Sequence, residues 1–296
     1  MPEDDERAMS DMRDKVENLE DALSIFLHNS NLLRNTGDGR VLMYRGQANS
    51  EFDLSPGIFR NDAIKRESQI IRELKRLAPS EFVSLESPLD RLIKMQHYGL
   101  PTRLLDITSN PLVALYFSCS DPLCQGKDGE VITVCDYPIA SDSVIVDLYA
   151  RLLTYEGTTG AELQKHTGSQ DSFWDQEKKP IIEHIKKHFP HKYLFVPVPL
   201  NNERICRQHG AFLLFGINVD EQMNPFQKEA FDVKKSIIEG SNDGICRSFI
   251  IPAEAKKKIL DELDSIGINH AFLFPELEHQ ASYIKQKYLD LMQEQE

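Results

Sequence analysis

The chain has 296 residues, of which 41% are hydrophobic, 8% aromatic and 27% charged, a composition typical of a globular protein. This length is near the upper limit that one hydrophobic core supports, so we expect one large domain with appendages rather than two equal domains. The formal net charge of -13 disfavours direct binding of nucleic acid or anionic lipid through the overall field, although a local basic pocket remains compatible with it.

The first 12 residues are acidic and polar, and they lack the positive start and apolar run of a signal peptide. From Asp14 onward, apolar residues recur at helical spacing, at Val16, Leu19, Leu23, Phe26 and Leu27. We therefore predict that residues 1–36 form a tail and an amphipathic helix packing on the core. No run approaches 18 apolar residues, which predicts a cytoplasmic protein without membrane contact.

Residues 41–44 form an apolar run that predicts a short buried strand, with Arg45 and Gly46 at its end. A helix is expected over 62–77, stopped by Pro79, with its apolar residues up to Leu77 turned inward. A second helix is expected over 88–98, with Ser87 as its cap.

Residues 102–107 predict a strand or extended segment, and Asn110-Pro111 opens a helix that is apolar nearly all round and therefore buried. Further strands are expected at 131–135, 194–198, 210–217 and 246–251, the second at an edge because it contains Pro197 and the third at the centre. Helices are expected over 253–265 and at the end of the chain.

The predicted fold is a single α+β domain, with a central mixed or antiparallel sheet of short strands surrounded by helices. It spans residues 37–290, with an insertion around 140–190 that holds a charged helix over 176–189.

Five cysteines without a C-x-x-C pair favour reduced thiols over a disulfide framework or a zinc ribbon. Cys119 follows an apolar helix, and we predict that it is a small residue of the hydrophobic core. His184, His188 and His191 fall at helical intervals, but the lysines between them favour a solvated helix end. No metal site is predicted.

Arg45 is unusual because a guanidinium seldom follows an apolar strand without a partner. One interpretation is a salt bridge to a core carboxylate such as Asp106. The other is recognition of a planar or phosphorylated ligand, with Gly46 letting the backbone approach it. The residues alone leave both open.

Polar residues crowd the segment 96–108, just before the apolar helix, so they form either a structural network or a ligand site. For Arg103 and Asp106 we favour a local ion pair that holds the loop. Thr108 or Ser109 is expected to cap the helix at Pro111. His97 by itself is more typical of a core or cap histidine than of a base.

These residues resemble the FRG family. The resemblance begins with Tyr44-Arg45-Gly46-Gln47, Leu54-Ser55-Pro56, Phe59-Arg60 and Glu67. It continues with the run from Gln96 to Asp106 and the helix from Asn110 to Phe117, and more weakly through Arg204, Gln208, Gly210, Phe212 and residues 266–268 and 273–275. It implies a protein of bacterial or phage origin with a role in phage conflict.

The order of an aromatic residue, Arg45 and Gly46 on a strand, followed by Thr and Ser residues before a helix, is similar to ADP-ribosyltransferases. That similarity implies that Arg45 holds the pyrophosphate of NAD and that Gly46 meets the nicotinamide. Those enzymes place a glutamate where Gln208-His209-Gly210 offers a glycine. His97, Asp106 or another acid would have to stabilise the transition state, or the site binds without reacting.

The leading hypothesis is therefore an enzyme acting on NAD or a nucleotide-like substrate, as an ADP-ribosyltransferase or NAD glycohydrolase, with His97 and Asp106 as candidate catalytic residues. The candidate ligand-binding residues are Tyr44, Arg45, Gly46, Gln47, Gln96, Thr102, Arg103, Thr108, Arg204 and Gln208. The alternative is a non-catalytic module that senses a nucleotide or binds a protein partner with the same residues.

Overall fold

The computed structural model describes residues 14–85, 87–151, 193–198, 203–216, 233–239 and 245–293. One sheet of six strands runs through this part of the chain in the order β4-β5-β2-β1-β3-β6, and its adjacent strands are antiparallel. The strands are β1 (Val41–Gln47), β2 (Leu104–Thr108), β3 (Gly129–Asp136), β4 (Tyr193–Pro197), β5 (Gly210–Phe215) and β6 (Ser248–Ile251). The predicted α+β fold is confirmed, with an antiparallel rather than a mixed sheet.

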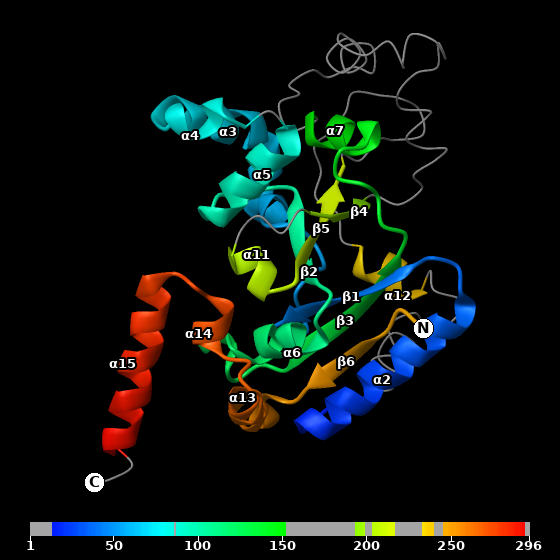
Figure 1. Ribbon diagram of the computed structural model, residues 1–296, viewed down its shortest axis with the longest axis vertical. Helices are drawn as coiled ribbons and strands as arrows, with labels where there is room; N and C mark the ends of the chain where they lie inside the picture. Colours follow the sequence, from blue (N-terminus) through cyan, green and yellow to red (C-terminus); the bar gives the residue numbers. More distant parts are fainter. Residues whose placement is uncertain are drawn as a thin grey trace, which may run out of the picture.

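The helices cover the sheet in separate groups (Figure 1). Helices α2 (Leu19–Thr36), α6 (Pro111–Cys119) and α13 (Lys256–Ser265) share a core with strands β1, β3 and β6. Helices α3 (Glu67–Leu77), α5 (Pro88–His97) and α7 (Val144–Arg151) share another with β2, β4 and β5. The short elements η1 (Gly57–Arg66) and α12 (Lys234–Glu239) contribute to a third core.

The remaining described elements are α4 (Ser80–Val83), η2 (Pro122–Cys124), α11 (Glu203–Arg207), η4 (Ala253–Ala255), α14 (His270–Leu273) and α15 (Leu277–Gln293). Helix α15 extends away from the sheet, at the lower left of Figure 1. In the described ranges no helix is long and apolar enough to cross a membrane.

Two glycines let helix α6 lie directly on the sheet. A Cβ on Gly46 would stand 1.9 Å from the backbone oxygen of Ala114, and one on Gly129 would stand 2.4 Å from that of Ser118. Real side chains do not approach backbone so closely, because interiors are packed near the van der Waals limit. The side of Gly46 that lacks a side chain therefore faces α6. Packing against α6 is therefore one reason for a glycine at position 46, and its predicted role in the approach of a ligand stays a prediction.

Strands β1 and β2 share a single register pair, Tyr44 with Thr108, whereas β2 and β5 share five. Strand β1 also continues through Arg45 to Gln47, where we had predicted that it ends at residue 44. Arg45 and Gln47 therefore extend from a strand that is paired with β3 on one side and only briefly with β2 on the other.

The first helix begins later than predicted. Residue Asn18 caps α2 by accepting a hydrogen bond from the Asp21 backbone, and Val16 lies before the helix, where its backbone N donates to Ile250 O at 2.9 Å. The buried face of α2 consists of Ala22, Phe26 and Asn29. Leu23 and Leu27, which we expected on that face, are exposed.

The helix predicted over 62–77 divides into two elements. Residues 57–66 form the 3-10 segment η1, broken by Asn61 and Asp62 with φ values of 53° and 59°, and α3 begins only at Glu67. Such left-handed residues cannot continue a right-handed helix. Leu77 is also exposed rather than inward.

Several other elements confirm their predictions. Ser87 caps α5 through the Leu89 backbone, α6 is buried nearly all round, and β4 lies at a sheet edge with β5 beside it. The helix expected over 176–189 and the histidines at 184, 188 and 191 lie outside the described residues.

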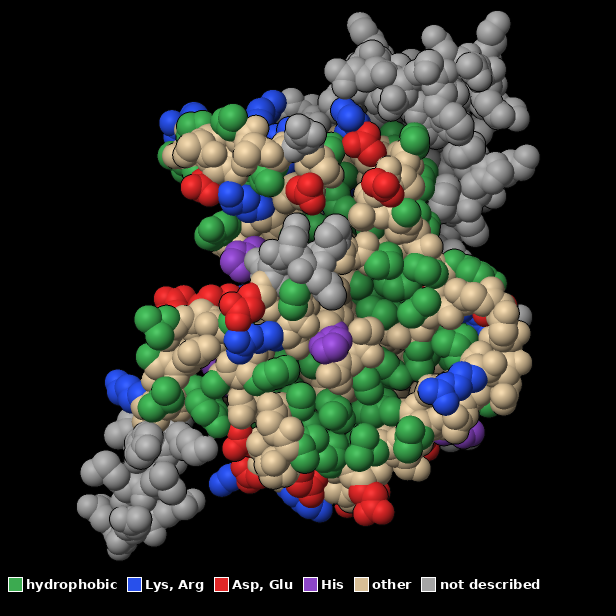
Figure 2. All heavy atoms as spheres, in the orientation of Figure 1, with side chains coloured by type: hydrophobic (Ala, Val, Ile, Leu, Met, Phe, Trp, Pro, Cys, Tyr) green, Lys and Arg blue, Asp and Glu red, His purple; other side chains and the backbone are tan. Residues whose placement is uncertain are grey.

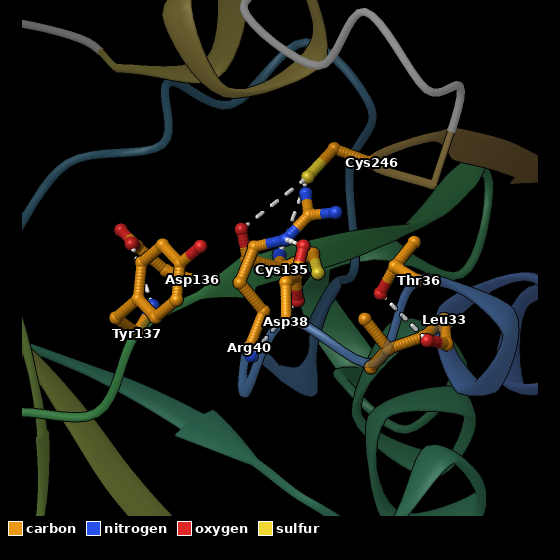
Figure 3. Close-up of polar contacts among 8 residues, drawn as sticks. All are labelled: Leu33, Thr36, Asp38, Arg40, Cys135, Asp136, Tyr137 and Cys246. Atoms are coloured by element: carbon orange, nitrogen blue, oxygen red, sulfur yellow. Dashed lines mark hydrogen bonds and ion pairs between the residues drawn. The ribbon is translucent and has the colours of Figure 1, made fainter.

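The cysteines are free thiols, and Cys119 is buried in the core as expected. Burial raises the pKa of its thiol to about 11. Figure 3 shows the region where β1 begins, in which Arg40 Nε donates to Asp38 at 2.7 Å and the Cys246 sulfur accepts from the Cys135 backbone N at 3.3 Å.

Candidate functional site

A cavity of about 780 Å³ opens beside the ends of β1 and β2, with walls from α5, α6, α11 and β5. Ten of the twelve predicted site residues line it, namely Tyr44, Arg45, Gly46, Gln47, Gln96, His97, Asp106, Thr108, Arg204 and Gln208. We call this cavity the cleft. Thr102 and Arg103 are buried outside it.

Arg45 reaches from β1 to the neighbouring strand β2. Its Nη1 donates to the backbone oxygen of Asp106 at 2.6 Å and lies 3.7 Å from the Asp106 carboxylate. That carboxylate is 63% exposed, so it is not the core partner that we considered for Arg45. An ion pair at this exposure stabilises the fold little. Arg45 Nε is buried and has no hydrogen-bond partner among the described residues.

A second arginine, Arg60 of η1, lines the cleft and stands over the ring of Phe52 at 5.9 Å from the ring centroid. Desolvation lowers the pKa of Arg45, Asp106 partly opposes that change, and repulsion from Arg60 adds to it. The two guanidinium groups are thus close enough to repel one another. An anion between them would remove that repulsion.

Gln47 lies two residues after Arg45, so both side chains leave β1 on the same face. Its Nε2 donates to Asp53 O at 3.0 Å, which fixes the amide. Its Oε1 is buried and lacks a hydrogen-bond partner in the described part of the chain. Two residues of one strand that line the cleft therefore each hold a buried polar atom without a hydrogen-bond partner among the described residues.

The amide of Gln96 joins α5 to β2. Its Oε1 accepts a short hydrogen bond from the Thr102 hydroxyl, and its Nε2 donates to Asp106 Oδ2 at 2.9 Å. The hydroxyl of Thr102 in turn accepts from the Leu104 backbone N at 3.1 Å. Because the hydroxyl donates to Oε1, the NH₂ group must face Asp106. Thr102 therefore orients the site from outside the cleft.

Arg103 has a different role from the one we predicted. It is fully buried, and its Nε and Nη2 both donate to Glu67, whose side chain is also buried. The expected pair between Arg103 and Asp106 does not form. The two residues are an odd number apart along an extended segment, so their side chains point to opposite faces. Arg103 anchors α3 to β2, and the structure gives no support for its assignment to the ligand site.

Thr108 and Gln208 join β2 to the segment before β5. The Thr108 hydroxyl donates to Gln208 O at 2.6 Å and accepts from Asn110 N at 3.0 Å. The cap of α6 is Asn110, which accepts from Leu112 N, rather than Thr108 or Ser109 as predicted. Asn110 follows these residues directly, at the position that can reach the second helical N–H.

Three further predicted residues have side-chain partners at the cleft wall. Gln208 Nε2 donates to Leu273 O at 3.1 Å, and the Arg204 guanidinium lies 4.7 Å from the Phe274 ring centroid. His97, the last residue of α5, has its Nε2 3.7 Å from Glu276 Oε1.

Tyr44 lines the cleft from the sheet, yet most of its ring packs in the core. It meets Phe26 edge-on at a centroid separation of 5.2 Å, and burial raises the pKa of its hydroxyl to about 12. The phenol is therefore neutral at ordinary pH. Tyr44 contributes a wall rather than a charge.

Several lining residues were not predicted. They include Phe52, Asp53, Arg60, Lys94, Phe117 and Asp121. The Phe59-Arg60 pair belonged to the family resemblance, but nothing in the sequence indicated that Arg60 approaches Arg45. Arg60 itself has an extended backbone (φ -77°, ψ 142°) next to the left-handed Asn61, a break in η1 that the sequence had not predicted.

The comparisons with known proteins concern the part of the chain that holds β1, α5, β2 and α6. No curated protein and no solved structure shows significant similarity to the chain. The model of the FRG domain matches residues 40–126, which include Arg45, Gln47, Arg60, Gln96 and Asp106. The chain therefore contains an FRG domain at residues 40–126.

Proposed function

We propose that the cleft binds a nucleotide-like ligand, with NAD as the first candidate, and that Arg45 and Arg60 hold its phosphate groups. The observation that carries this proposal is the pair of unpaired atoms on β1, Arg45 Nε and Gln47 Oε1, which are buried at the cleft wall. A buried polar atom without a partner costs about 1–3 kcal/mol. A ligand that draws both side chains toward the cleft and hydrogen-bonds to them would offset that cost.

The charge of the wall favours an anion. In a chain with a net charge of -13, two arginines converge at this wall and repel one another. Guanidinium groups bind phosphate through two parallel hydrogen bonds, which is stronger than a neutral contact. A phosphate bound to Arg45 Nε would also satisfy its unpaired donor.

The size and the other walls suit a nucleoside. A volume of about 780 Å³ lies in the range of small-molecule sites. Phe52, Phe117 and Phe212 supply apolar surface for a flat ring, and the carboxylate of Asp121 could accept hydrogen bonds from ribose hydroxyls.

Calorimetry with NAD, ADP-ribose, AMP, adenosine and inorganic phosphate would test the proposal. We expect NAD and ADP-ribose to bind. Arg45→Met should lower the affinity for both by about 10- to 100-fold, which corresponds to the loss of one charge-assisted hydrogen bond. Arg34→Met, on the exposed last turn of α2 and outside the cleft, is the matched control. If the folded wild-type protein binds none of the nucleotides, the proposal is wrong.

A second candidate function is consumption of NAD, as an ADP-ribosyltransferase or NAD glycohydrolase. It is favoured by the Asp106 carboxylate, which stands in the cleft and is held by the Gln96 amide. Gly210 occupies the position where the similar transferases have a glutamate. Asp106 is on the strand paired with it, opposite Phe212, so a carboxylate could be supplied from the adjacent strand.

Nicotinamide release from NAD would measure this activity. We expect Asp106→Asn to abolish release while leaving NAD affinity within about threefold, because the carboxylate would act on the developing positive charge of the sugar. If Asp106→Asn released nicotinamide at the wild-type rate, Asp106 would not be the residue that stabilises this positive charge. Binding of NAD without turnover would favour the sensing module, and an NAD-consuming activity would fit a role in conflict between bacteria and phages.

A further inference from the structure

The phenylalanine and tyrosine rings that line the cleft differ in how much of each ring the protein already covers. Tyr44 and Phe212 are buried in the core, and Phe117 on α6 is half-buried. Phe52 and Tyr98 are exposed, at 39% and 71% of their surface. These two rings therefore have the most surface left for a ligand.

The surroundings of the two exposed rings are different. The Arg60 guanidinium stands 5.9 Å from the centroid of the Phe52 ring. Tyr98 meets His97 edge-on at 5.3 Å, and no arginine or lysine of the described residues stands over its ring. A nucleotide carries its base and its phosphate on one ribose, so the ring that stacks on the base and the cation that binds the phosphate must be neighbours. Phe52 meets this requirement.

The loop after β1, which carries Phe52, is held at its backbone by side chains from distant parts of the chain. Lys256 of α13 donates to Ala48 O at 2.7 Å, and Lys234 of α12 donates to Ser50 O at 2.8 Å. Both lysines lie outside the FRG domain. Because these hydrogen bonds already fix the loop, little conformational freedom is lost when a ligand stacks on the ring.

The cleft is open at the molecular surface. Figure 2 shows a hollow between the part formed by α3, α4 and α5 and the part formed by α14 and α15. Helix α5 borders this hollow and lines the cleft with Gln96 and His97. The Asp106 carboxylate in the cleft is also 63% exposed. A flat ring bound here therefore needs one stacking partner, and its other face can remain in solvent.

We infer that Phe52 is the residue on which the base of the ligand stacks, and that the cleft therefore selects nucleotides over phosphate compounds that lack a base. The inference rests on the proposed nucleotide binding and assigns the base to one wall of the cleft. Every base has a π face, so stacking on an aromatic side chain favours nucleotides as a class. Lys234 and Lys256 are positioning residues, because they act on the base through the loop that carries Phe52.

Calorimetry with ADP-ribose and with inorganic pyrophosphate, which carries two phosphates without a base, would test the inference. Phe52→Ala should lower the affinity for ADP-ribose by about 5- to 100-fold, which is the scale of one stacked base. It should leave the affinity for pyrophosphate within about twofold of wild type. Phe52→Tyr keeps the aromatic face and should bind ADP-ribose nearly as wild type does, whereas Arg45→Met should weaken both ligands.

Phe272→Ala is the matched control. Phe272 is 38% exposed, and the Arg207 guanidinium lies 6.0 Å from its ring centroid, so it resembles Phe52 in exposure and in its cation. Neither Phe272 nor Arg207 lines the cleft. Phe272→Ala should leave both affinities unchanged, and so should Tyr98→Ala for pyrophosphate and ADP-ribose alike.

Three results would overturn the assignment of the base to Phe52. They are wild-type affinity for ADP-ribose in Phe52→Ala, an equal loss for pyrophosphate in that variant, and a loss in Phe52→Tyr as large as in Phe52→Ala. In each case the binding of ADP-ribose by wild type would still support the proposed function. If wild type binds pyrophosphate but no nucleotide, or binds neither, the proposed function fails and the base subsite fails with it.

Discussion

The contact between Gly46 and helix α6 gives the most direct prediction. In Gly46→Ala the new Cβ would lie 1.9 Å from Ala114 O, and a separation of at least 3.0 Å is needed, so strand and helix must move apart by about 1 Å. Both groups are backbone in a closely packed core and cannot rotate away. Overpacking of this kind costs about 1–3 kcal/mol and occasionally more. We expect about 3 kcal/mol or more for Gly46→Ala.

Urea unfolding followed by circular dichroism would measure this free energy, with two other glycines as references. A Cβ on Gly129 would stand 2.4 Å from Ser118 O, and one on Gly126 meets nothing within 4 Å. The expected order of destabilisation is therefore Gly46→Ala, then Gly129→Ala, with Gly126→Ala within about 0.5 kcal/mol of wild type. If Gly46→Ala kept wild-type stability and lost only ligand affinity, Gly46 would serve the ligand, as the sequence had suggested.

Arg103→Met should cost about 3–5 kcal/mol in urea unfolding, because it removes the positive charge that is hydrogen-bonded to the buried Glu67 carboxylate. Adding Glu67→Leu should recover much of that loss. A double variant as unstable as the sum of both changes would contradict this. Asn110→Ala should cost about 0.5–2 kcal/mol, because the Leu112 N–H loses its cap, and an unchanged unfolding midpoint would show that the cap is replaced. The free energy of unfolding should also fall as the pH rises from 9 to 11. Burial raises the pKa of the Cys119 thiol to about 11, so in this range the thiol loses its proton in the unfolded chain but keeps it in the folded protein. Unfolding at several pH values should show a smaller fall in Cys119→Ala, and an equal fall in both proteins would assign it to other groups.

The sequence alone determined the features that depend on local chemistry. Ser87 before Pro88 predicted a capped helix, and Pro197 predicted an edge strand. The apolar run that follows Asn110 predicted a buried helix. The structure confirms all three predictions. Each rests on a residue whose backbone geometry or hydrogen bonding is restricted within a few positions along the chain.

The direction of a side chain was harder to predict, because it depends on what lies across from it. The buried stripe of α2 runs through Ala22, Phe26 and Asn29, so Leu23 and Leu27 face solvent although they follow Leu19 at helical spacing. Arg103 turned inward because Glu67, which is far away in sequence, offers a buried carboxylate.

Most residues of the candidate site could therefore be predicted from the sequence, but their arrangement in space could not. The sequence identified ten residues that line one cleft. Only the tertiary structure showed that β1 and β2 share just the Tyr44–Thr108 pair, that Arg60 lines the same cleft as Arg45, and that Glu276 lies beside His97. These features arise from contacts between segments far apart in the chain, and no local pattern encodes which of the available partners will meet once the whole core is packed.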